Sequence, residues 1–338
     1  MINIQYISQD QLLKSGCLDI KHSIEVVEKS IVDFMNGRII YPEKTVQVFD
    51  PITQNRINIL PATLIQENIC GVKWVSVFPD NPHKYNKLNV TAVIILSETK
   101  TGYPMAFMEG SLVSNLRTAA VSAIAAKYLA MPESKTIGFI GAGENAKMNL
   151  LAIMAVYPGI ETCFVSSRTL KTEQKFIQDM SKYFPKLRFI SCETSHQKAV
   201  HSADIIVTAT SAQADLLKAK WIKKGAFYSH IGGWEDEYAV PLRASKIICD
   251  DWESTKQRRQ TISRMYKEKI IDDYSIYANL GEILCGSKPG RENNREFIYF
   301  NTVGLSYTDI ALAYSMYTKV LNCDNGINLI LKSKPLFG

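Results

Sequence analysis

The feature that most constrains the fold is a short apolar run that leads directly into a glycine-rich turn and a helical pattern. Residues 136–140 (TIGFI) are mostly apolar and follow polar residues, which predicts a buried strand. The turn at 141–146 (GAGENA) matches G-x-G-x-x-A, and apolar residues at helical spacing predict a helix at 145–156. Such a turn lets the backbone approach a pyrophosphate, whose charge lies against unpaired N–H groups at the helix start. We therefore expect a dinucleotide to contact Gly141, Ala142, Gly143, Glu144 and Asn145.

Strands and helices alternate after this turn. Alternation of this kind predicts right-handed crossovers and a parallel sheet that binds its ligand at the carboxyl ends of the strands. The sequence therefore predicts an α/β protein with a Rossmann-type, doubly wound parallel sheet domain over residues 119–309. Its strands are predicted at 162–166, 188–190, 204–209, 226–231 and 246–250, and its further helices at 171–184 and 196–201.

The first third of the chain has a different pattern. A helical pattern at 10–36 precedes several strand-like runs, and an alanine-rich helix is predicted at 111–129. The last helix, predicted at 308–320, returns to this part of the chain. We therefore expect a second, discontinuous α+β domain that binds the substrate, formed by residues 1–118 and 310–338. Its strands are predicted at 45–49, 56–61, 69–77 and 90–97.

Composition argues against several classes of protein. The chain has 338 residues, of which 46% are hydrophobic and 21% charged, and no apolar stretch is long enough to span a membrane. The seven cysteines form no C-x-x-C pair and the histidines lack metal-ligand spacing, so we predict neither a disulfide framework nor a metal site. The net charge of +6 is spread along the chain without alternating basic and aromatic residues, which argues against a nucleic-acid partner. The N-terminus lacks a secretory signal, so we expect a cytoplasmic protein.

The residues after the second strand of the parallel sheet bear on the choice of dinucleotide. An acidic side chain there accepts a hydrogen bond from the 2′-hydroxyl of NAD, but this sequence has Ser166, Ser167 and Arg168 instead. Hydroxyls and an arginine suit a 2′-phosphate better, so we expect NAD or NADP with a preference for NADP. In the alternative, Ser167 binds the ribose of NAD and Arg168 is solvated.

Three segments together resemble the ornithine cyclodeaminase and mu-crystallin family. They are GVKW at 71–74, MEGSLVSNLRTAA at 108–120 and the glycine turn, and the resemblance covers essentially the whole chain. It implies an NAD(P)-dependent oxidoreductase that acts on a small amino acid or imine and forms a homodimer through the first domain. It also implies that Lys73 and Arg117 bind the substrate, and we add Thr118 and Thr210 as candidate cofactor contacts.

Further segments resemble those members of the family that act in 2,3-diaminopropionate biosynthesis. They are NPHKYN at 81–86, DDW at 250–252, LGE at 280–282 and PGRE at 289–292. The resemblance implies oxidation of a glutamate adduct at its Cα–N bond, followed by hydrolysis of the imine to 2-oxoglutarate and 2,3-diaminopropionate. Two departures keep alternatives open. Cyclodeaminases of the family carry an aspartate soon after a glycine pair, whereas here Trp234 intervenes, and ketimine reductases that resemble mu-crystallin have an arginine comparable to Arg168 and use NADPH.

The implied substrate carries several carboxylates, so cationic side chains are the first candidates for its site. Arg56, Lys73 and Arg117 lie near predicted strand or helix ends. An arginine offers a carboxylate a bidentate fork, whereas a desolvated lysine can also accept a proton. Proton transfer needs a base, and we expect Glu235 or Asp236, in the loop after a predicted strand, to supply it alongside Lys73. The alternative is that these two acids cap the next segment.

Three functional classes remain compatible with the sequence. The first is an amino-acid dehydrogenase acting at a C–N bond, the second is an NADPH-dependent imine reductase or cyclodeaminase, and the third is a non-catalytic protein that keeps the dinucleotide as a ligand. The presence of Lys73 and Arg117 argues against the third class, because a protein that binds only the dinucleotide does not require cations for a substrate.

Overall fold

The computed structural model describes residues 2–50 and 52–334, and the chain divides into two compact units. The first unit comprises Met1–Arg117 and Leu305–Gly338, and the second comprises Thr118–Gly304. The sequence predicts domain boundaries at 118/119 and 309/310. The second boundary lies earlier because helix α12 (Ser306–Asn322) begins before residue 310. In the described part of the chain, no helix is long and apolar enough to cross a membrane.

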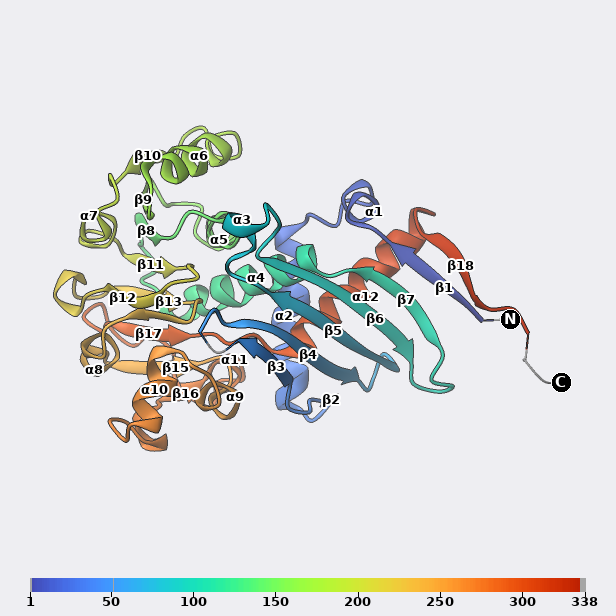
Figure 1. The fold of residues 1–338 in the computed structure, drawn as a ribbon. Coiled ribbons are helices and arrows are strands. Elements are labelled where there is room, and N and C mark those ends of the chain that lie inside the picture. The colour runs from blue at the N-terminus through green and yellow to red at the C-terminus, as the bar shows by residue number, and fades with distance from the viewer. Residues whose placement is uncertain (1, 51, 335–338) are drawn as a thin grey trace. The chain divides into compact units, whose positions relative to one another are not determined.

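The first unit contains an eight-stranded, mostly antiparallel sheet in the order β18-β1-β7-β6-β5-β4-β2, with β3 paired to β4. Burial alternates along strands such as β4 because one face of the sheet packs against helices. Helix α12 packs against α2 and lies over β4 and β5 (Figure 1). The strands are β1 (Ile2–Ile7), β2 (Ile39–Ile40), β3 (Thr45–Asp50), β4 (Asn55–Leu64), β5 (Ile69–Val77), β6 (Val90–Glu98), β7 (Pro104–Glu109) and β18 (Ile327–Lys332). The other helices of this unit are α1 (Gln9–Lys14), α2 (Ile20–Met35) and α3 (Asn81–Lys84).

The helical pattern at 10–36 corresponds to two helices, because the chain breaks between α1 and α2. Gly16 has a φ of +69°, in the left-handed region that glycine adopts readily. Asp19 then caps α2, and its side chain accepts a hydrogen bond from the backbone N–H of His22 at 3.1 Å. The apolar spacing continues across this break, so periodicity alone does not reveal it.

The second unit contains an eight-stranded sheet in the order β10-β9-β8-β11-β13-β17-β15-β16, and all of its pairs are parallel (Figure 1). The order reverses between β8 and β11, which makes that point the expected ligand crevice of a doubly wound sheet. The predicted α/β class with a Rossmann-type domain is therefore confirmed. The strands are β8 (Thr136–Ile140), β9 (Thr162–Ser166), β10 (Arg188–Ser191), β11 (Ile205–Thr208), β13 (Phe227–His230), β15 (Lys246–Cys249), β16 (Ala278–Asn279) and β17 (Ile298–Asn301).

Helices connect these strands, and a small additional sheet follows β11 and β13. That sheet pairs β12 (Gln213–Leu217) with β14 (Trp234–Asp236) in parallel, and the sequence gives no sign of either strand. The helices are α5 (Glu144–Val156), α6 (Leu170–Met180), α7 (His196–Val200), α8 (Ala239–Arg243), α9 (Trp252–Lys256), α10 (Thr261–Lys267) and α11 (Leu280–Leu284), with short 3₁₀ turns at η1 (Ala219–Trp221) and η2 (Asp273–Ser275). Helix α4 (Ser111–Leu129) begins in the first unit and continues into the second.

Candidate functional site

Three charged side chains meet inside the first unit. Lys73 lies on the buried side of β5, Asp309 in the first turn of α12, and Arg117 on α4. Lys73 Nζ donates to Asp309 Oδ2 at 2.6 Å and to the hydroxyl of Ser114 at 3.2 Å. Arg117 Nε donates to Asp309 Oδ1 at 2.8 Å. We call Lys73, Arg117 and Asp309 the cationic cluster.

Burial of the cationic cluster lowers the pKa of Lys73. The side chain of Lys73 is 1% exposed, and that of Asp309 is fully buried. Burial, followed by the nearby charge of Arg117, lowers the pKa of Lys73 to about 8, although the charge and hydrogen bond of Asp309 act in the opposite direction. Within the described chain the two cations share one carboxylate, so the cluster has a net positive charge when Lys73 is protonated. An anionic ligand beside it compensates that charge.

The third expected cation, Arg56, lies further along the same sheet. The register of β4 and β5 pairs Lys73 with Leu60, and Arg56 is about 13 Å away from Leu60 along the strand. The Nη1 of Arg56 donates to the carbonyl oxygen of Gln54 at 2.9 Å. The structure therefore groups Lys73 with Arg117, while Arg56 has a different position on the sheet.

Asp309, which joins the two cations, was not among the site residues expected from the sequence. The sequence does contain a pattern that points to Asp309. It is the one acidic residue in α12, and it lies at helical spacing from the apolar residues Leu305, Ala313 and Met316, which are buried. A carboxylate on the buried face of a helix requires a cationic or hydrogen-bonding partner. The partners could not be identified because they lie 236 and 192 residues away in the sequence.

The glycine turn of the second unit has the geometry that a pyrophosphate needs. Gly141 has a φ of +108°, and a Cβ atom there would lie 2.5 Å from the carbonyl oxygen of Ala209. Gly143 precedes α5 and has no other described atom within 4 Å of its ideal Cβ position. No side chain caps α5, whose first residues Glu144 and Asn145 are exposed. The turn therefore leaves space and backbone N–H groups at the helix start for an anion.

The expected adenosine contacts follow β9. Ser167 is 7% exposed, and its hydroxyl donates to the carbonyl oxygen of Thr169 at 2.9 Å, whereas the side chain of Arg168 is exposed. The other two candidate contacts with the cofactor are Thr118 and Thr210. Thr118 lies on α4 and is 8% exposed. The backbone N–H of Thr210 already donates to Glu235 Oε1 at 2.5 Å.

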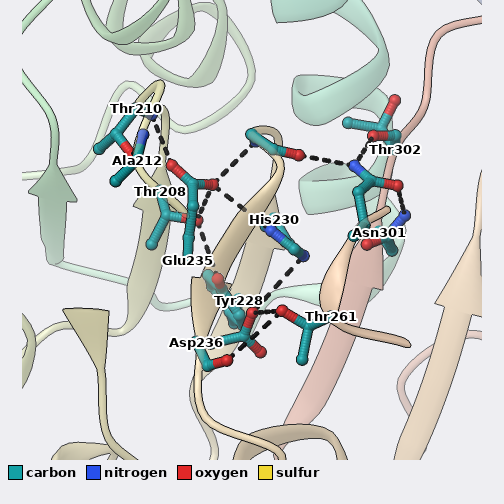
Figure 2. A network of polar contacts seen from close by, with 12 residues as sticks. Thr208, Thr210, Ala212, Tyr228, His230, Glu235, Asp236, Thr261, Asn301 and Thr302 are labelled. Carbon is teal, nitrogen blue, oxygen red and sulfur yellow. Dashed lines mark hydrogen bonds and ion pairs between the residues drawn. The ribbon is translucent and has the colours of Figure 1, made fainter. Parts of the chain in front are cut away.

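Glu235 and Asp236 lie on β14 and are both fully buried, so the loop expected at these two residues is instead a short strand. Glu235 accepts hydrogen bonds from the Thr208 hydroxyl at 2.8 Å and from the backbone N–H of Gly232 at 2.8 Å (Figure 2). With its contact to Thr210, it therefore fixes the segments that follow β11 and β13. Burial raises the pKa of Glu235, and these hydrogen bonds partly oppose that shift.

Asp236 belongs to the same buried network (Figure 2). Its Oδ1 accepts a hydrogen bond from the hydroxyl of Thr261 at 2.6 Å, and burial raises its pKa to about 8. His230 Nδ1 lies 2.8 Å from the hydroxyl of Tyr299, and burial lowers the pKa of His230 to about 3, so the imidazole is neutral. The network is internal to the second unit. In the described residues no cluster of histidine, cysteine, aspartate or glutamate side chains has the arrangement of a metal site.

Comparison with known proteins identifies the family to which a chain with these features belongs. The model of the ornithine cyclodeaminase/mu-crystallin family matches residues 14–324. An N-((2S)-2-amino-2-carboxyethyl)-L-glutamate dehydrogenase of Staphylococcus aureus is 30% identical over 96% of this chain and 98% of its own length.

Two solved structures are similar over almost the whole chain. One is the Delta(1)-pyrroline-2-carboxylate reductase of Thermococcus litoralis in complex with NADH and L-proline, at 34% identity and a TM-score of 0.91, covering 96% of this chain and 100% of that one. The other is an archaeal alanine dehydrogenase dimer with bound NAD, at 27% identity and a TM-score of 0.90, covering 98% of this chain and 100% of that one. The resemblance inferred from the motifs is confirmed: the chain belongs to the ornithine cyclodeaminase/mu-crystallin family and is an NAD(P)-dependent oxidoreductase.

Proposed function

We propose that this protein oxidises N-(2-amino-2-carboxyethyl)-L-glutamate at the Cα–N bond of its glutamyl half. Water then hydrolyses the imine to 2-oxoglutarate and L-2,3-diaminopropionate. The observation that carries the proposal is the cationic cluster, in which Lys73 and Arg117 share Asp309 and so favour a substrate rich in carboxylates. The similarity to the Staphylococcus aureus dehydrogenase, which spans both chains almost completely, supports this choice of substrate.

The residues of the cluster take distinct roles in this proposal. Arg117 presents a planar fork that suits a substrate carboxylate, and Asp309 fixes its orientation through Nε. Lys73 holds or releases a proton at Nζ near neutral pH, because burial brings its pKa to about 8. The amine proton of the substrate therefore has an acceptor in the neutral form of Lys73. Arg56 extends the same sheet face and is a candidate for a more distant carboxylate.

The nicotinamide dinucleotide, when bound, accepts the hydride that leaves Cα. We propose that the turn at Gly141, Ala142 and Gly143 and the first residues of α5, Glu144 and Asn145, hold its pyrophosphate. We further propose that Ser167 and Arg168 lie at its ribose, with Thr118 and Thr210 as additional contacts. We assign NAD(H) as the natural cofactor in place of the NADP(H) that the sequence favours, because the Ser167 hydroxyl is already used as an internal donor.

Glu235 and Asp236 receive a positioning role in place of the proton-transfer role expected from the sequence. Both are fully buried, and Glu235 holds the backbone N–H groups of Thr210 and Gly232. These residues follow β11 and β13 at the carboxyl end of the sheet, where a doubly wound fold binds its ligand. Loss of Glu235 would therefore disturb the ligand-binding edge without removing a reacting group.

A second candidate function is reduction of a cyclic imine such as Δ1-pyrroline-2-carboxylate. The 34% identity and TM-score of 0.91 to the Thermococcus litoralis reductase favour it. Its substrate has one carboxylate, so it makes less use of the two cations of the cluster.

The two functions are separated by following the absorbance of the reduced dinucleotide. We expect purified protein to form NADH from NAD⁺ and N-(2-amino-2-carboxyethyl)-L-glutamate, with 2-oxoglutarate as a product. Arg117→Lys should raise KM about tenfold, equivalent to about 1.4 kcal/mol, whereas Arg38→Lys, at an exposed arginine that pairs with Asp33, should leave it unchanged. Turnover of Δ1-pyrroline-2-carboxylate alone would reject the first function in favour of the second.

We also propose a homodimer formed through the first unit. Tyr6, Phe107 and Ile95 register with one another across β1, β7 and β6, and all three are more than a third exposed. Trp74 adds a fourth large exposed side chain, on the side of β5 opposite Lys73. A contiguous apolar face of this kind is typical of a protein–protein interface, and the similar archaeal alanine dehydrogenase is a dimer.

A further inference from the structure

A single buried carboxylate holds two strand-end segments of the second unit together. Glu173 lies in α6 and is fully buried. Its Oε1 accepts hydrogen bonds from the backbone N–H groups of Ser167 at 2.9 Å and Thr194 at 2.8 Å. Its Oε2 accepts from the backbone N–H of Glu193 at 3.0 Å and from the Ser191 hydroxyl at 2.5 Å. We call these five residues the Glu173 clasp.

The clasp maintains an uncommon backbone conformation. Glu193 and Thr194 have φ angles of 53° and 65°, in the left-handed region that residues other than glycine rarely adopt. Such strained residues persist where the surrounding structure fixes them. Here the N–H groups of both residues donate to the same carboxylate, so Glu173 holds the segment after β10 in this shape and ties it to the segment after β9.

The four hydrogen-bond donors to the Glu173 carboxylate are all neutral groups, three backbone N–H groups and one hydroxyl. In a doubly wound sheet the segment after the second strand meets the adenine ribose. The strand order makes β9 that second strand, directly beside β8 and its glycine turn.

The donors of Ser167 are already used at this position. The backbone N–H of Ser167 donates to Glu173, and its hydroxyl lies 2.9 Å from the carbonyl oxygen of Thr169 and also contacts the hydroxyl of Thr172, so its proton is used within the protein. A hydroxyl whose proton is used can still accept a hydrogen bond. It can therefore bind the 2′-hydroxyl of a ribose, which is a donor, but it cannot bind a phosphate oxygen, which is only an acceptor.

We infer that the Glu173 clasp shapes the adenine-ribose end of the dinucleotide site and selects a 2′-hydroxyl over a 2′-phosphate. The inference rests on the proposed dinucleotide site and makes Glu173 a positioning residue that acts through Ser167. The side chain of Arg168, which the sequence relates to NADP, is exposed, so the inference depends on Ser167 and the carboxylate behind it.

Calorimetric titration with NADH and NADPH tests the inference without a substrate. We expect the wild-type protein to bind NADH more tightly than NADPH, and Glu173→Gln to reduce this ratio of dissociation constants about tenfold or more, equivalent to about 1.4 kcal/mol. The matched control is Glu161→Gln, which removes an exposed carboxylate just before β9, at the opposite end of the strand. This control should leave the ratio unchanged.

Hydrogen exchange of the cofactor-free wild type provides a second measurement that does not depend on whether Glu173→Gln folds. We expect the amides of Ser167, Glu193 and Thr194 to be protected, and rapid exchange at all three would overturn the inference. Tighter binding of NADPH by the wild type, or an unchanged ratio in Glu173→Gln, would overturn it while leaving dinucleotide binding intact. A wild type that binds neither nucleotide would overturn the proposed function as well.

Discussion

The cationic cluster makes a quantitative prediction about stability, which Asp309→Asn tests. Asparagine keeps the shape of the side chain but removes the charge that Lys73 and Arg117 share. Removing one partner of a buried ion pair costs about 3 to 5 kcal/mol. The full burial of Asp309 and the 1% exposure of Lys73 make that range applicable here. We expect a loss of this size in the free energy of unfolding at neutral pH.

The loss should depend on pH in a defined direction. The pKa of Lys73 in the folded chain, about 8, lies below its ordinary value of 10.5, so in that interval the unfolded chain binds more protons and stability rises with pH. Asp309 raises this pKa, so its removal lowers the pKa of Lys73 below 8 and starts the rise at lower pH in the variant. From neutral pH upwards, the deficit relative to wild type therefore shrinks as pH approaches 8.

Urea unfolding followed by circular dichroism measures the deficit. Wild type and variant are compared at equal protein concentration, because assembly stabilises the folded state by mass action. The matched control is Asp10→Asn, which removes an exposed carboxylate of the same unit from the first turn of α1. A deficit below about 1 kcal/mol, the size of a typical exposed ion pair, or one that grows with rising pH would refute the reasoning.

Three further predictions address separate parts of the molecule. Gly141→Ala should lower the free energy of unfolding by about 1 to 3 kcal/mol, because its φ is +108° and the new Cβ would lie 2.5 Å from the carbonyl oxygen of Ala209; an unchanged thermal midpoint would contradict this. Substrate affinity should fall as pH rises through about 8, where Lys73 loses its charge, and Lys73→Arg should move this fall in the pH profile of KM to higher pH. Trp74→Glu should dissociate the dimer in analytical ultracentrifugation, whereas Tyr274→Glu, at a side chain that is 96% exposed in the second unit, should not; a dimer that survives Trp74→Glu would remove the assigned interface.

The features that were predictable from the sequence are those with local signals. The glycine turn and the alternating strands follow from short-range patterns, so β8, α5 and the parallel sheet were recognisable. Lys73 was identified through its motif, but Asp309 was not paired with it, because 236 residues separate them. In the sequence Glu173 is one of several charged positions in a polar helix, and only the folded structure shows that it is buried.

Short elements held by tertiary contacts were also beyond prediction. β12 and β14 form a two-stranded sheet with few residues, so neither has a periodic pattern long enough to identify it. The acids of β14 therefore looked like loop residues suited to proton transfer. The segment turns inward because Glu235 accepts hydrogen bonds from the Thr208 hydroxyl and the Gly232 backbone.

The most direct test of the account is a calorimetric titration of wild type and Gly143→Val with NADH. The backbone at Gly143, with φ −82° and ψ −173°, suits valine, and no other described atom lies within 4 Å of the ideal Cβ, so the variant should fold with an unchanged thermal midpoint. Its side chain would occupy the space proposed for the pyrophosphate. We predict saturable NADH binding by wild type and none by Gly143→Val. Equal binding by both proteins, or binding by neither, would contradict a dinucleotide held over the start of α5.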